Sequence, residues 1–480
     1  FLPPFAASAG HWVVDSRPAI GDIWHDMAVP AALRSVLAEV TAAPEEEAQV
    51  LDVEKEILDL CQAALPELVF GSLHRVGAFQ LGVQEPKAEL DLVFVLPEGS
   101  PSQPSQLLER LQQALPKATP SLPQGALNAP GLRWLHGSHG GTRSVQLFLA
   151  KDDKQPAGAD TPSTAALYAK EVSSALMENV PSLESFRNLL KLVKHWAKRR
   201  GLYGNLFGFF NGMTWAVCCG RVCQDHPDAA LDDLFHFFFQ DLCRWDWSSP
   251  ITLQGTQGTS NAPGSAPPNT LVLLPGNSHG RPPVPASGKV SEAVMRLVLR
   301  ELRRAELKKL PELWAEHQFF NRHRHYIRFD FMASRPEILE RWWVWGQQQL
   351  PELLHLFESV VDSKVLLRPW PIALDFKDAS WKHAKAVCIG LHLQRTEKKS
   401  ILDLREIMVK FLEMITAWPE AEAQMSKFEL MIRAVTAEEM RAWLEDQGAD
   451  ASVPVAASPE HEAMLQPPGL GGYSPVSAAA

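Results

Sequence analysis

Glu89 and Asp91 are the first side chains in this sequence whose types and spacing could do chemistry. They lie two positions apart in the apolar run 88–96, which predicts a β-strand, so both carboxylates project from the same face. Two adjacent carboxylates repel each other unless a proton or a divalent cation lies between them. The pair therefore indicates a metal site, with an edge strand that turns acidic residues toward solvent as the alternative.

A second group of residues, suited to bind phosphate, lies in the segment 186–215. Apolar residues recur there at the spacing of one helix face, with Ser182 as the expected N-cap and Gly201 as the expected C-cap. A stripe of basic side chains runs along the same helix: Arg187, Lys191, Lys194 and Lys198. Such a stripe is commonly a solvated face, but here it leads into Tyr203 and a Gly-aromatic loop at 208–212. Charge for phosphates and a flat neighbour for a base together predict a bound nucleoside triphosphate.

The same segment resembles a known protein family. From Lys194 to Trp215 the sequence follows, without a gap, the pattern K-x-W-A-K-R-R-G-x-Y-x-N-x-x-G-F-x-x-G-x-x-W of the central domain of eukaryotic poly(A) polymerases. The resemblance continues more loosely over residues 60–415. It implies a nucleotidyltransferase that adds AMP from ATP to RNA 3′ ends without a template.

By this resemblance, five residues of the central segment hold the nucleotide. Lys194 would pair with the triphosphate, and Tyr203 and Asn205 would contact phosphate or ribose. Gly212 and Met213 would flank the adenine. The resemblance implies ATP as the substrate and Mg²⁺ or Mn²⁺ as the cofactor.

The resemblance also places a phosphate cradle before the acidic strand. The family's F-G-S motif is matched by Phe70, Gly71 and Ser72. Ser72 and its flanking amides would cradle the triphosphate. Eight residues, 73–80, separate Ser72 from the L-G-V motif at 81–83, where the family has two. Because residues 73–77 themselves resemble a second copy of the loop, we interpret this segment as an insertion or a gene-model error.

The metal site departs from the family pattern at two positions. Glu89 replaces the first Asp of the family's Asp-x-Asp strand, and the strand predicted at 144–150 places Gln146 at the position of the third Asp. In the two-metal mechanism, cations about 4 Å apart activate the 3′-hydroxyl and hold the leaving pyrophosphate. Glu moves the ligand oxygens by one methylene, and Gln removes a charge and a proton acceptor. We therefore expect metal ligation by Glu89 and Asp91, with a defective third catalytic position.

Three functions follow as hypotheses. The first is a polynucleotide adenylyltransferase that acts in mRNA polyadenylation. The alternative is a catalytically silent RNA-binding relative that keeps the nucleotide cleft but not the metals. A third hypothesis, transfer of another nucleotide or to a non-RNA acceptor, is disfavoured by the long match in the central segment.

The fold class expected is a multidomain α+β protein. It would combine a nucleotidyltransferase domain of the polymerase β type, a helical central domain and an RRM-like α+β C-terminal domain. The boundaries expected are an N-terminal segment of unknown structure at 1–45, the catalytic domain at 46–160, the central domain at 161–315, the RRM-like domain at 316–445 and a disordered tail at 446–480.

Composition limits the classes of partner. The chain has 480 residues and a net charge of −10, so any surface that binds RNA must be local. Its six cysteines show no paired framework, which suits a reducing compartment, and the family implies the nucleus, with the cytoplasm as a second location. No run is long and apolar enough to span a membrane, and nothing at the start resembles a signal peptide. The partners expected are the RNA 3′ end, ATP and a pre-mRNA 3′-processing complex, with the chain itself a monomer.

Two other clusters have alternative interpretations. Cys219, Cys223 and His226 have helical spacing that suits a metal, but small buried residues on a core helix explain them better. His323 and His325, on one face of a predicted strand, could also ligate a metal, but the sequence offers no partner ligands for them. Candidate RNA phosphate contacts are Arg322, Arg324, Arg328, Lys382, Lys385, Lys398 and Lys399.

Overall fold

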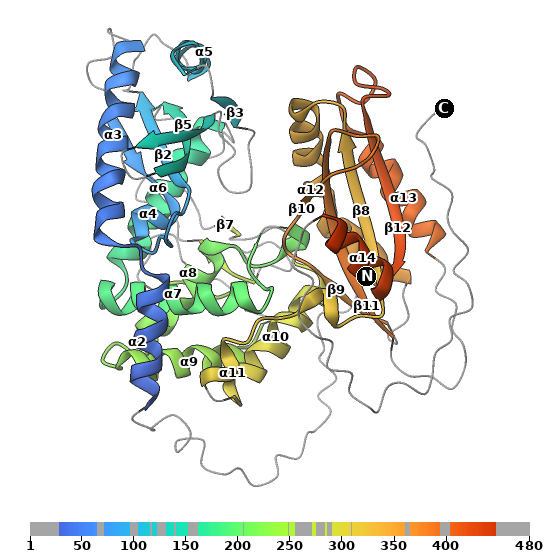
Figure 1. Ribbon diagram of the computed structural model, residues 1–480. Coiled ribbons are helices and arrows are strands. Elements are labelled where there is room, and N and C mark those ends of the chain that lie inside the picture. The colour runs from blue at the N-terminus through green and yellow to red at the C-terminus, as the bar shows by residue number, and fades with distance from the viewer. Residues whose placement is uncertain are drawn as a thin grey trace. The chain divides into compact units, whose positions relative to one another are not determined.

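The structure of the protein is a computed structural model of residues 1–480. It describes residues 28–64, 72–96, 104–115, 118–121, 131–138, 141–151, 162–204, 206–247, 249–254, 271–274, 284–285, 290–308, 310–360, 365–393 and 404–447. The chain forms two compact units (Figure 1). Unit 1 comprises residues 1–199, 210–288 and 299–315, and unit 2 comprises residues 200–209, 289–298 and 316–480.

Unit 1 contains a five-stranded mixed sheet with the order β1-β2-β5-β4-β3. Its strands are β1 (Ser72–Arg75), β2 (Leu90–Leu96), β3 (Thr119–Ser121), β4 (Gly131–Ser138) and β5 (Gly141–Lys151). The central strands β2 and β5 pair in parallel, and the other pairs are antiparallel. Strand β2 is nearly continuously apolar because helices cover both of its faces.

The two faces of this sheet bury different side chains. On one face, α3 (Pro44–Ala64) and α5 (Pro104–Ala114) contribute Val53, Ile57 and Leu107 to a core with Leu92 and Phe94 of β2. The opposite face carries a smaller cluster that includes residues 76, 93, 95, 148 and 150. On that side α6 (Pro162–Glu178) contacts β2 and β5. Asp91 and the alternate residues of β2 that project from the same face therefore face α6.

The helical part of unit 1 is built around α7, at the position that the apolar spacing predicts. Its helices are α2 (Ala28–Val40), α7 (Leu183–Arg199), α8 (Gly212–Asp225), α9 (Leu231–Arg244) and α11 (Leu310–Leu313), with α10 (Glu292–Glu306) shared between the units. The Oγ atom of Ser182 accepts a hydrogen bond from Ser185 N at 3.2 Å, and Gly201 has a φ of +62° after the helix ends. Both expected caps are confirmed. The ring of Trp196 packs edge-on against Trp215 and Phe239, which fixes α8 and α9 on α7.

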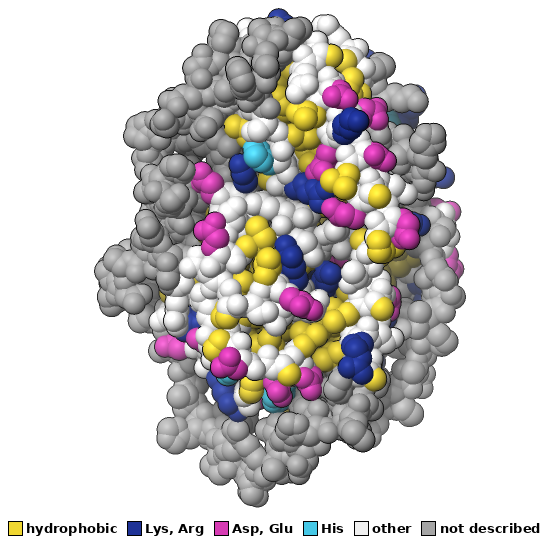
Figure 2. Space-filling view, turned by 90° about the vertical axis from the view of Figure 1, so that its left-hand side faces the viewer, with side chains coloured by type: hydrophobic (Ala, Val, Ile, Leu, Met, Phe, Trp, Pro, Cys, Tyr) yellow, Lys and Arg dark blue, Asp and Glu magenta, His cyan; other side chains and the backbone are white. Residues whose placement is uncertain are grey.

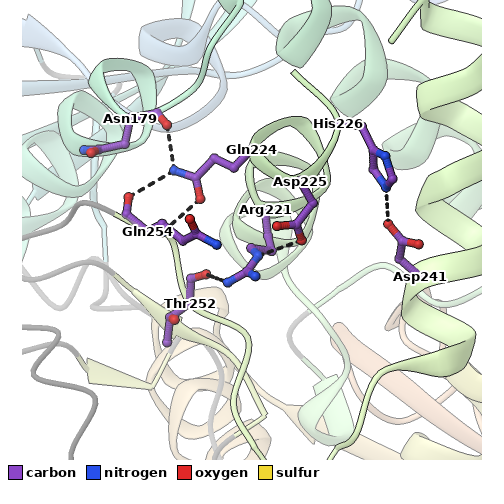
Figure 3. Close-up of polar contacts among 8 residues, drawn as sticks. All are labelled: Asn179, Arg221, Gln224, Asp225, His226, Asp241, Thr252 and Gln254. Atoms are coloured by element: carbon purple, nitrogen blue, oxygen red, sulfur yellow. Dashed lines mark hydrogen bonds and ion pairs between the residues drawn. The ribbon is translucent and has the colours of Figure 1, made fainter. Parts of the chain in front are cut away.

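Polar contacts fix the end of α8 to its neighbours (Figure 3). Gln224 donates to the backbone oxygens of Asn179, at 2.7 Å, and of Gln254, at 3.0 Å. His226 forms a 2.8 Å contact with Asp241 of α9. The chain then forms the short antiparallel pair β6 (Leu273–Leu274) and β7 (Val284–Pro285).

Unit 2 is an antiparallel sheet with the order β10-β11-β8-β12, and β9 pairs with the far half of β11. Its elements are β8 (His325–Ala333), α12 (Pro336–Val360), β9 (Val365–Pro369), β10 (Leu374–Phe376), β11 (His383–Leu393), α13 (Arg405–Thr416), β12 (Phe428–Thr436) and α14 (Ala437–Asp446), with the 3₁₀ turns η1 (Leu206–Gly208) and η2 (Phe319–Asn321). The expected α+β class is confirmed. The RRM-like character of this sheet and the expected domain boundaries stay predictions.

Helices cover both faces of the sheet in unit 2. On one face, Trp342 of α12 packs against Phe331 and Phe411 of α13 packs against Phe329. On the other face, Met440 and Leu444 of α14 pack into a cluster with residues 319, 326 and 388. The guanidinium of Arg328 lies 4.1 Å from the ring centroid of Trp443, also on α14.

Arg328 is buried beneath α14 and belongs to an ion-pair network. Its Nε and Nη2 donate to Asp330, at 2.7 and 2.9 Å, and Arg433 donates to the same carboxylate at 3.2 Å. The expectation that Arg328 contacts an RNA phosphate is wrong, because its charge is already satisfied inside the unit. Lys385 pairs with Asp375 at 2.5 Å, while Arg322, Arg324 and Lys382 are exposed. Lys398 and Lys399 lie outside the described residues.

Candidate active site

The three positions expected at the metal site lie together at one end of the unit 1 sheet. Asp91 of β2 pairs in parallel register with Gln146 of β5, so their side chains project from the same face. Glu89 directly precedes β2, and its Oε1 accepts a hydrogen bond from Ser144 Oγ at 2.6 Å. The neighbourhood that the sequence predicts is therefore present, with two carboxylates and one amide.

The helix α4 (Gly77–Leu81) begins beside Asp91. Gly77 has a φ of +61°, and a Cβ atom on it would lie 3.8 Å from Asp91 Oδ2. Val76 N donates to the backbone oxygen of Asp91 at 3.0 Å. The backbone of residues 76–78 is therefore placed to contact a group held by Asp91.

Ser72, which the resemblance implies as the phosphate cradle, lies at the end of β1 away from Gly77, and its role stays a prediction. It pairs with Val95, four positions along β2 from Asp91, a separation of about 13 Å at the usual rise per strand residue. Residues 72–75 pair as a strand, so the chain turns toward Asp91 only at Gly77. Phe70 and Gly71 lie outside the described residues.

The spacing to the L-G-V motif favours a second alignment of the phosphate loop. Two residues, 79 and 80, separate Ala78 from Leu81, which is the spacing of the family. In this alignment residues 73–77 precede the motif, and the structure places them in β1 and in the turn that leads into α4. At the hydroxyl position of the F-G-S motif this alignment leaves Ala78, which has no side-chain hydrogen-bond donor.

The basic stripe of α7 holds the segment that follows α4. Arg187 Nε donates to Leu81 O at 2.7 Å, and Lys194 Nζ donates to Val83 O at 3.0 Å. Lys198 Nζ forms a 2.7 Å ion pair with Glu85. The stripe is therefore not a solvated face. It joins the helical part of unit 1 to the loop beside Asp91 through charge-assisted hydrogen bonds.

Burial controls the charge of this contact. Lys194 is 6% exposed, and burial lowers the pKa of its ammonium to about 8, although Glu85 acts in the opposite direction. Burial raises the pKa of Glu85, but the hydrogen bond and the charge of Lys198 outweigh it, so this pKa is lowered overall. Lys194 stays mainly protonated at pH 7 and can offer its other N–H groups to an anion.

The remaining nucleotide contacts that the resemblance implies fall on two units. Gly212 and Met213 form the first turn of α8 in unit 1, where Asn211 Oδ1 accepts from Thr214 N at 2.9 Å as the N-cap. Tyr203 is half-buried and belongs to unit 2. Asn205 lies outside the described residues. The roles of these residues in binding ATP stay predictions.

The cysteine cluster is part of the core of α8. Burial raises the pKa of the Cys223 thiol to about 12 and that of Cys219 well above its usual value, so both thiols are protonated at pH 7. His226 turns to Asp241 and stacks on Phe237. Within the described residues, no group of three or more His, Cys, Asp and Glu side chains could hold a metal ion. In the same part of the chain, no helix is long and apolar enough to cross a membrane.

The family model described as the poly(A) polymerase central domain matches residues 185–313, which include α7, α8 and α9. The chain is a relative of the eukaryotic poly(A) polymerases. Nuclear poly(A) polymerase 1 of Arabidopsis thaliana is 25% identical over 374 residues, which cover 71% of this chain and 52% of the plant protein. Poly(A) polymerase pla1 of Schizosaccharomyces pombe is 25% identical over 356 residues, or 68% of this chain and 62% of the yeast protein.

This poly(A) polymerase relative spans about half the length of the curated relatives that it matches. Among solved structures, a cytoplasmic RNA terminal U-transferase is similar at 13% identity and a TM-score of 0.43, covering 62% of this chain and 99% of that one. The expected resemblance is confirmed.

Proposed function

We propose that this poly(A) polymerase relative is a polynucleotide adenylyltransferase that transfers AMP from ATP to RNA 3′ ends. The observation that carries the proposal is the meeting of Glu89, Asp91 and the turn at Gly77 at one end of the sheet. The matched central domain supports it, because α7 holds the loop beside this site through Arg187 and Lys194. The backbone amides of Gly77 and Ala78 would bind triphosphate oxygens, and Lys194 would add a positive charge.

The donor set suits a hard divalent cation. Glu89, Asp91 and the Gln146 carbonyl offer oxygen ligands, which Mg²⁺ and Mn²⁺ prefer. A bound cation would neutralise triphosphate charge and lower the pKa of the RNA 3′-hydroxyl. Gln146 contributes no charge and cannot take the hydroxyl proton. We therefore expect slow transfer with Mg²⁺ and faster transfer with Mn²⁺, which tolerates imperfect geometry better.

Primer extension of a 5′-labelled oligo(A) tests this function. We expect adenylate addition with ATP, little with CTP or UTP, and loss of the activity in Asp91→Asn. Equal use of all four nucleotides would overturn the adenylate assignment. Activity that survives Asp91→Asn would show that the site lies elsewhere.

A second candidate is the catalytically silent RNA-binding relative. It is favoured by Gln146, which occupies the position opposite Asp91, and by the missing hydroxyl at Ala78. Under this alternative the protein binds ATP and RNA but extends no primer with either metal. Calorimetry with ATP, run beside the extension assay, separates it from a protein that has lost the nucleotide site altogether.

We place the protein in the nucleus by analogy with relatives whose names say nuclear. Its RNA contacts would lie on exposed basic residues of unit 2, such as Arg322 and Lys382, because α14 covers the sheet face above Arg328. We also propose that the protein is a monomer and that a pre-mRNA 3′-processing complex recruits it. Co-purification of processing factors with the tagged protein from nuclear extract tests the recruitment.

A further inference from the structure

A pocket of 510 Å³ lies in unit 1 beside the outer strand β1. Its lining comes from α3, β1, α4, the segment after α4, α6 and α7. Glu89, Asp91, Gln146 and Lys194 are not among the lining residues. The pocket therefore contains none of the proposed metal ligands, although it shares Arg187 and part of the segment after Gly77 with the loop beside the proposed transfer site.

Two cations in this pocket have no carboxylate partner among the described residues. Lys170 Nζ forms its hydrogen bond with the imidazole Nε2 of His74 at 3.2 Å, and Arg187 Nε donates to Leu81 O. A third cation, Arg75, is neutralised because it donates to Glu54 at 2.5 and 2.9 Å and to Glu47 at 2.5 Å. The pocket thus keeps an excess of positive charge, contributed by Lys170 and Arg187.

This excess charge is local. Figure 2, which views the left-hand side of Figure 1, shows Lys and Arg side chains interspersed with Asp and Glu side chains. The chain as a whole carries a net charge of −10. On this face the two signs of charge are mixed, so an anion would be held by the residues of the pocket itself.

His74 is the hydrogen-bond partner of Lys170. Burial and the charge of Lys170 lower the pKa of His74, so its imidazole is neutral at pH 7 and Nε2 accepts a hydrogen bond. Lys170 keeps two further N–H groups for a ligand, and the Arg187 guanidinium keeps its Nη groups.

The pocket also has buried acceptors that lack donors. The Oε1 atoms of Gln80 and Gln84 are buried without a hydrogen-bond partner. The Nε2 of Gln80 donates to Lys170 O at 2.9 Å and to Ser174 Oγ at 3.1 Å, which fixes the orientation of this amide. A buried carbonyl oxygen without a donor is costly, so these two atoms favour a ligand with O–H or N–H groups.

We propose that this pocket binds a phosphate ester that carries hydroxyl or amino donors, of which a nucleoside monophosphate unit is the matching class. Lys170 and Arg187 would hold the phosphate, and the amide oxygens of Gln80 and Gln84 would accept from ribose hydroxyls or base amino groups. The unit comes either from a free mononucleotide or from a nucleotide within single-stranded RNA. The proposal does not depend on catalysis at Asp91.

Calorimetry of the full chain with AMP, in EDTA so that no divalent cation is present, tests this site. We expect AMP to bind to the wild type and to Asp91→Asn alike, and Lys170→Gln to weaken binding about tenfold or more. The matched control is Lys55→Gln, which removes the same charge from an exposed position on α3. Absence of AMP binding at millimolar concentration would overturn the proposal, as would equal affinity in Lys170→Gln and the wild type.

A second variant tests the acceptors separately from the charge. Gln84→Leu removes a buried oxygen, so it should weaken AMP but leave the affinity for inorganic phosphate unchanged. Equal weakening of both ligands would contradict the assigned role of Gln84. Binding of an oligo(A) hexamer distinguishes the two sources of the nucleotide. If the hexamer binds more tightly than AMP and loses affinity in Lys170→Gln, the site binds RNA. If AMP binds more tightly than the hexamer, the site binds the free nucleotide.

Discussion

The chemistry of the carboxylate site depends on one amide. Gln146 lies in register with Asp91, so an acidic side chain at this position would join Asp91 without any change of backbone. The side chain of Glu89, by contrast, is one methylene longer than the Asp expected there, and its carboxylate accepts a hydrogen bond from Ser144. The lost charge at 146 and the displaced oxygens at 89 are therefore separate defects.

We expect Gln146→Asp together with Glu89→Asp to raise the rate of adenylate addition by about 100-fold or more, since misplacement alone can cost that much. The double variant restores a charge, a proton acceptor and the shorter ligand. Single-turnover primer extension with Mg²⁺ measures the gain, and Gln146→Glu separates charge from length. A double variant no faster than the wild type would favour the silent relative and would implicate Ala78.

The buried Lys194 gives a prediction for pH. Its pKa is lowered from 10.5 to about 8 in the fold, so the unfolded chain binds more protons between these values. The contribution of Lys194 to stability therefore becomes more favourable as pH rises from 8 to 10.5, and it is least favourable below pH 8. We expect the free energy of unfolding of the wild type to rise, relative to Lys194→Met, across this window. Urea denaturation at several pH values measures the difference, and a flat difference would contradict the burial of a charged Lys194.

At the scale of elements, the turn from β1 into α4 positions the backbone beside Asp91. Gly77 takes a left-handed conformation there, and a Cβ atom on it would lie 3.8 Å from Asp91 Oδ2. A larger side chain at this turn would both strain the backbone and fill the space next to the carboxylate.

We expect Gly77→Val to lower ATP affinity at least tenfold, whereas Ser72→Ala should leave it unchanged, because Ser72 lies opposite Val95. Calorimetry with ATP and Mg²⁺ measures both variants, and thermal unfolding shows whether Gly77→Val still folds. A large loss of ATP affinity in Ser72→Ala would show that residues 70–72 form the phosphate cradle.

The contact of α14 with β8 predicts an asymmetry between two ion pairs. Asp330→Ala would leave Arg328 buried without its carboxylate, which should destabilise unit 2 by about 3–5 kcal/mol. Asp375→Ala breaks the Lys385 pair, whose carboxylate side chain is 80% exposed, and should cost about 1 kcal/mol or less. Chemical denaturation compares the two. Equal losses would mean that the Arg328 pair is not shielded from water.

The sequence predicted elements with strong periodicity and missed those without it. Helix α7 follows from its apolar spacing, and the meeting of Asp91 with Gln146 follows from the alignment of two apolar strands. The five-residue helix α4 is too short to show a helical period in the sequence. The phosphate loop was therefore predicted from the identity of residues 70–72 with the F-G-S motif, and not from the distance to Leu81.

Contacts made by single side chains could not be predicted from the pattern. Arg328 is in a segment with four neighbouring basic or imidazole residues, and composition alone favoured a phosphate contact. Its burial depends on Asp330 two positions later and on α14 more than a hundred residues away. The partners of Lys170 and Arg187 likewise come from distant segments.

For the whole molecule, a net charge of −10 requires that RNA binding be local and dependent on salt. We expect the logarithm of the affinity for single-stranded RNA to fall with the logarithm of salt concentration, with a slope of about −0.7 for each phosphate contacted. Arg322→Gln and Lys382→Gln should each reduce this slope, because both side chains are exposed. Fluorescence anisotropy at several salt concentrations measures it. Slopes identical to that of the wild type would move the RNA site out of unit 2.

The pairing of β8 with β11 and β12 also sets an order of events during synthesis. Strand β8 is complete in sequence at residue 333, but its partner β12 ends only at residue 436, and the helix that covers their shared face follows it. In a chain that emerges from the ribosome N-terminal end first, the edge of β8 that pairs with β12 therefore has no partner for more than a hundred residues, whereas β11 can pair with the other edge once residue 393 has emerged. Unit 1, whose residues end at 315, can fold in the meantime. Slower translation of residues 394–436 would lengthen the time for which this edge of β8 is unpaired.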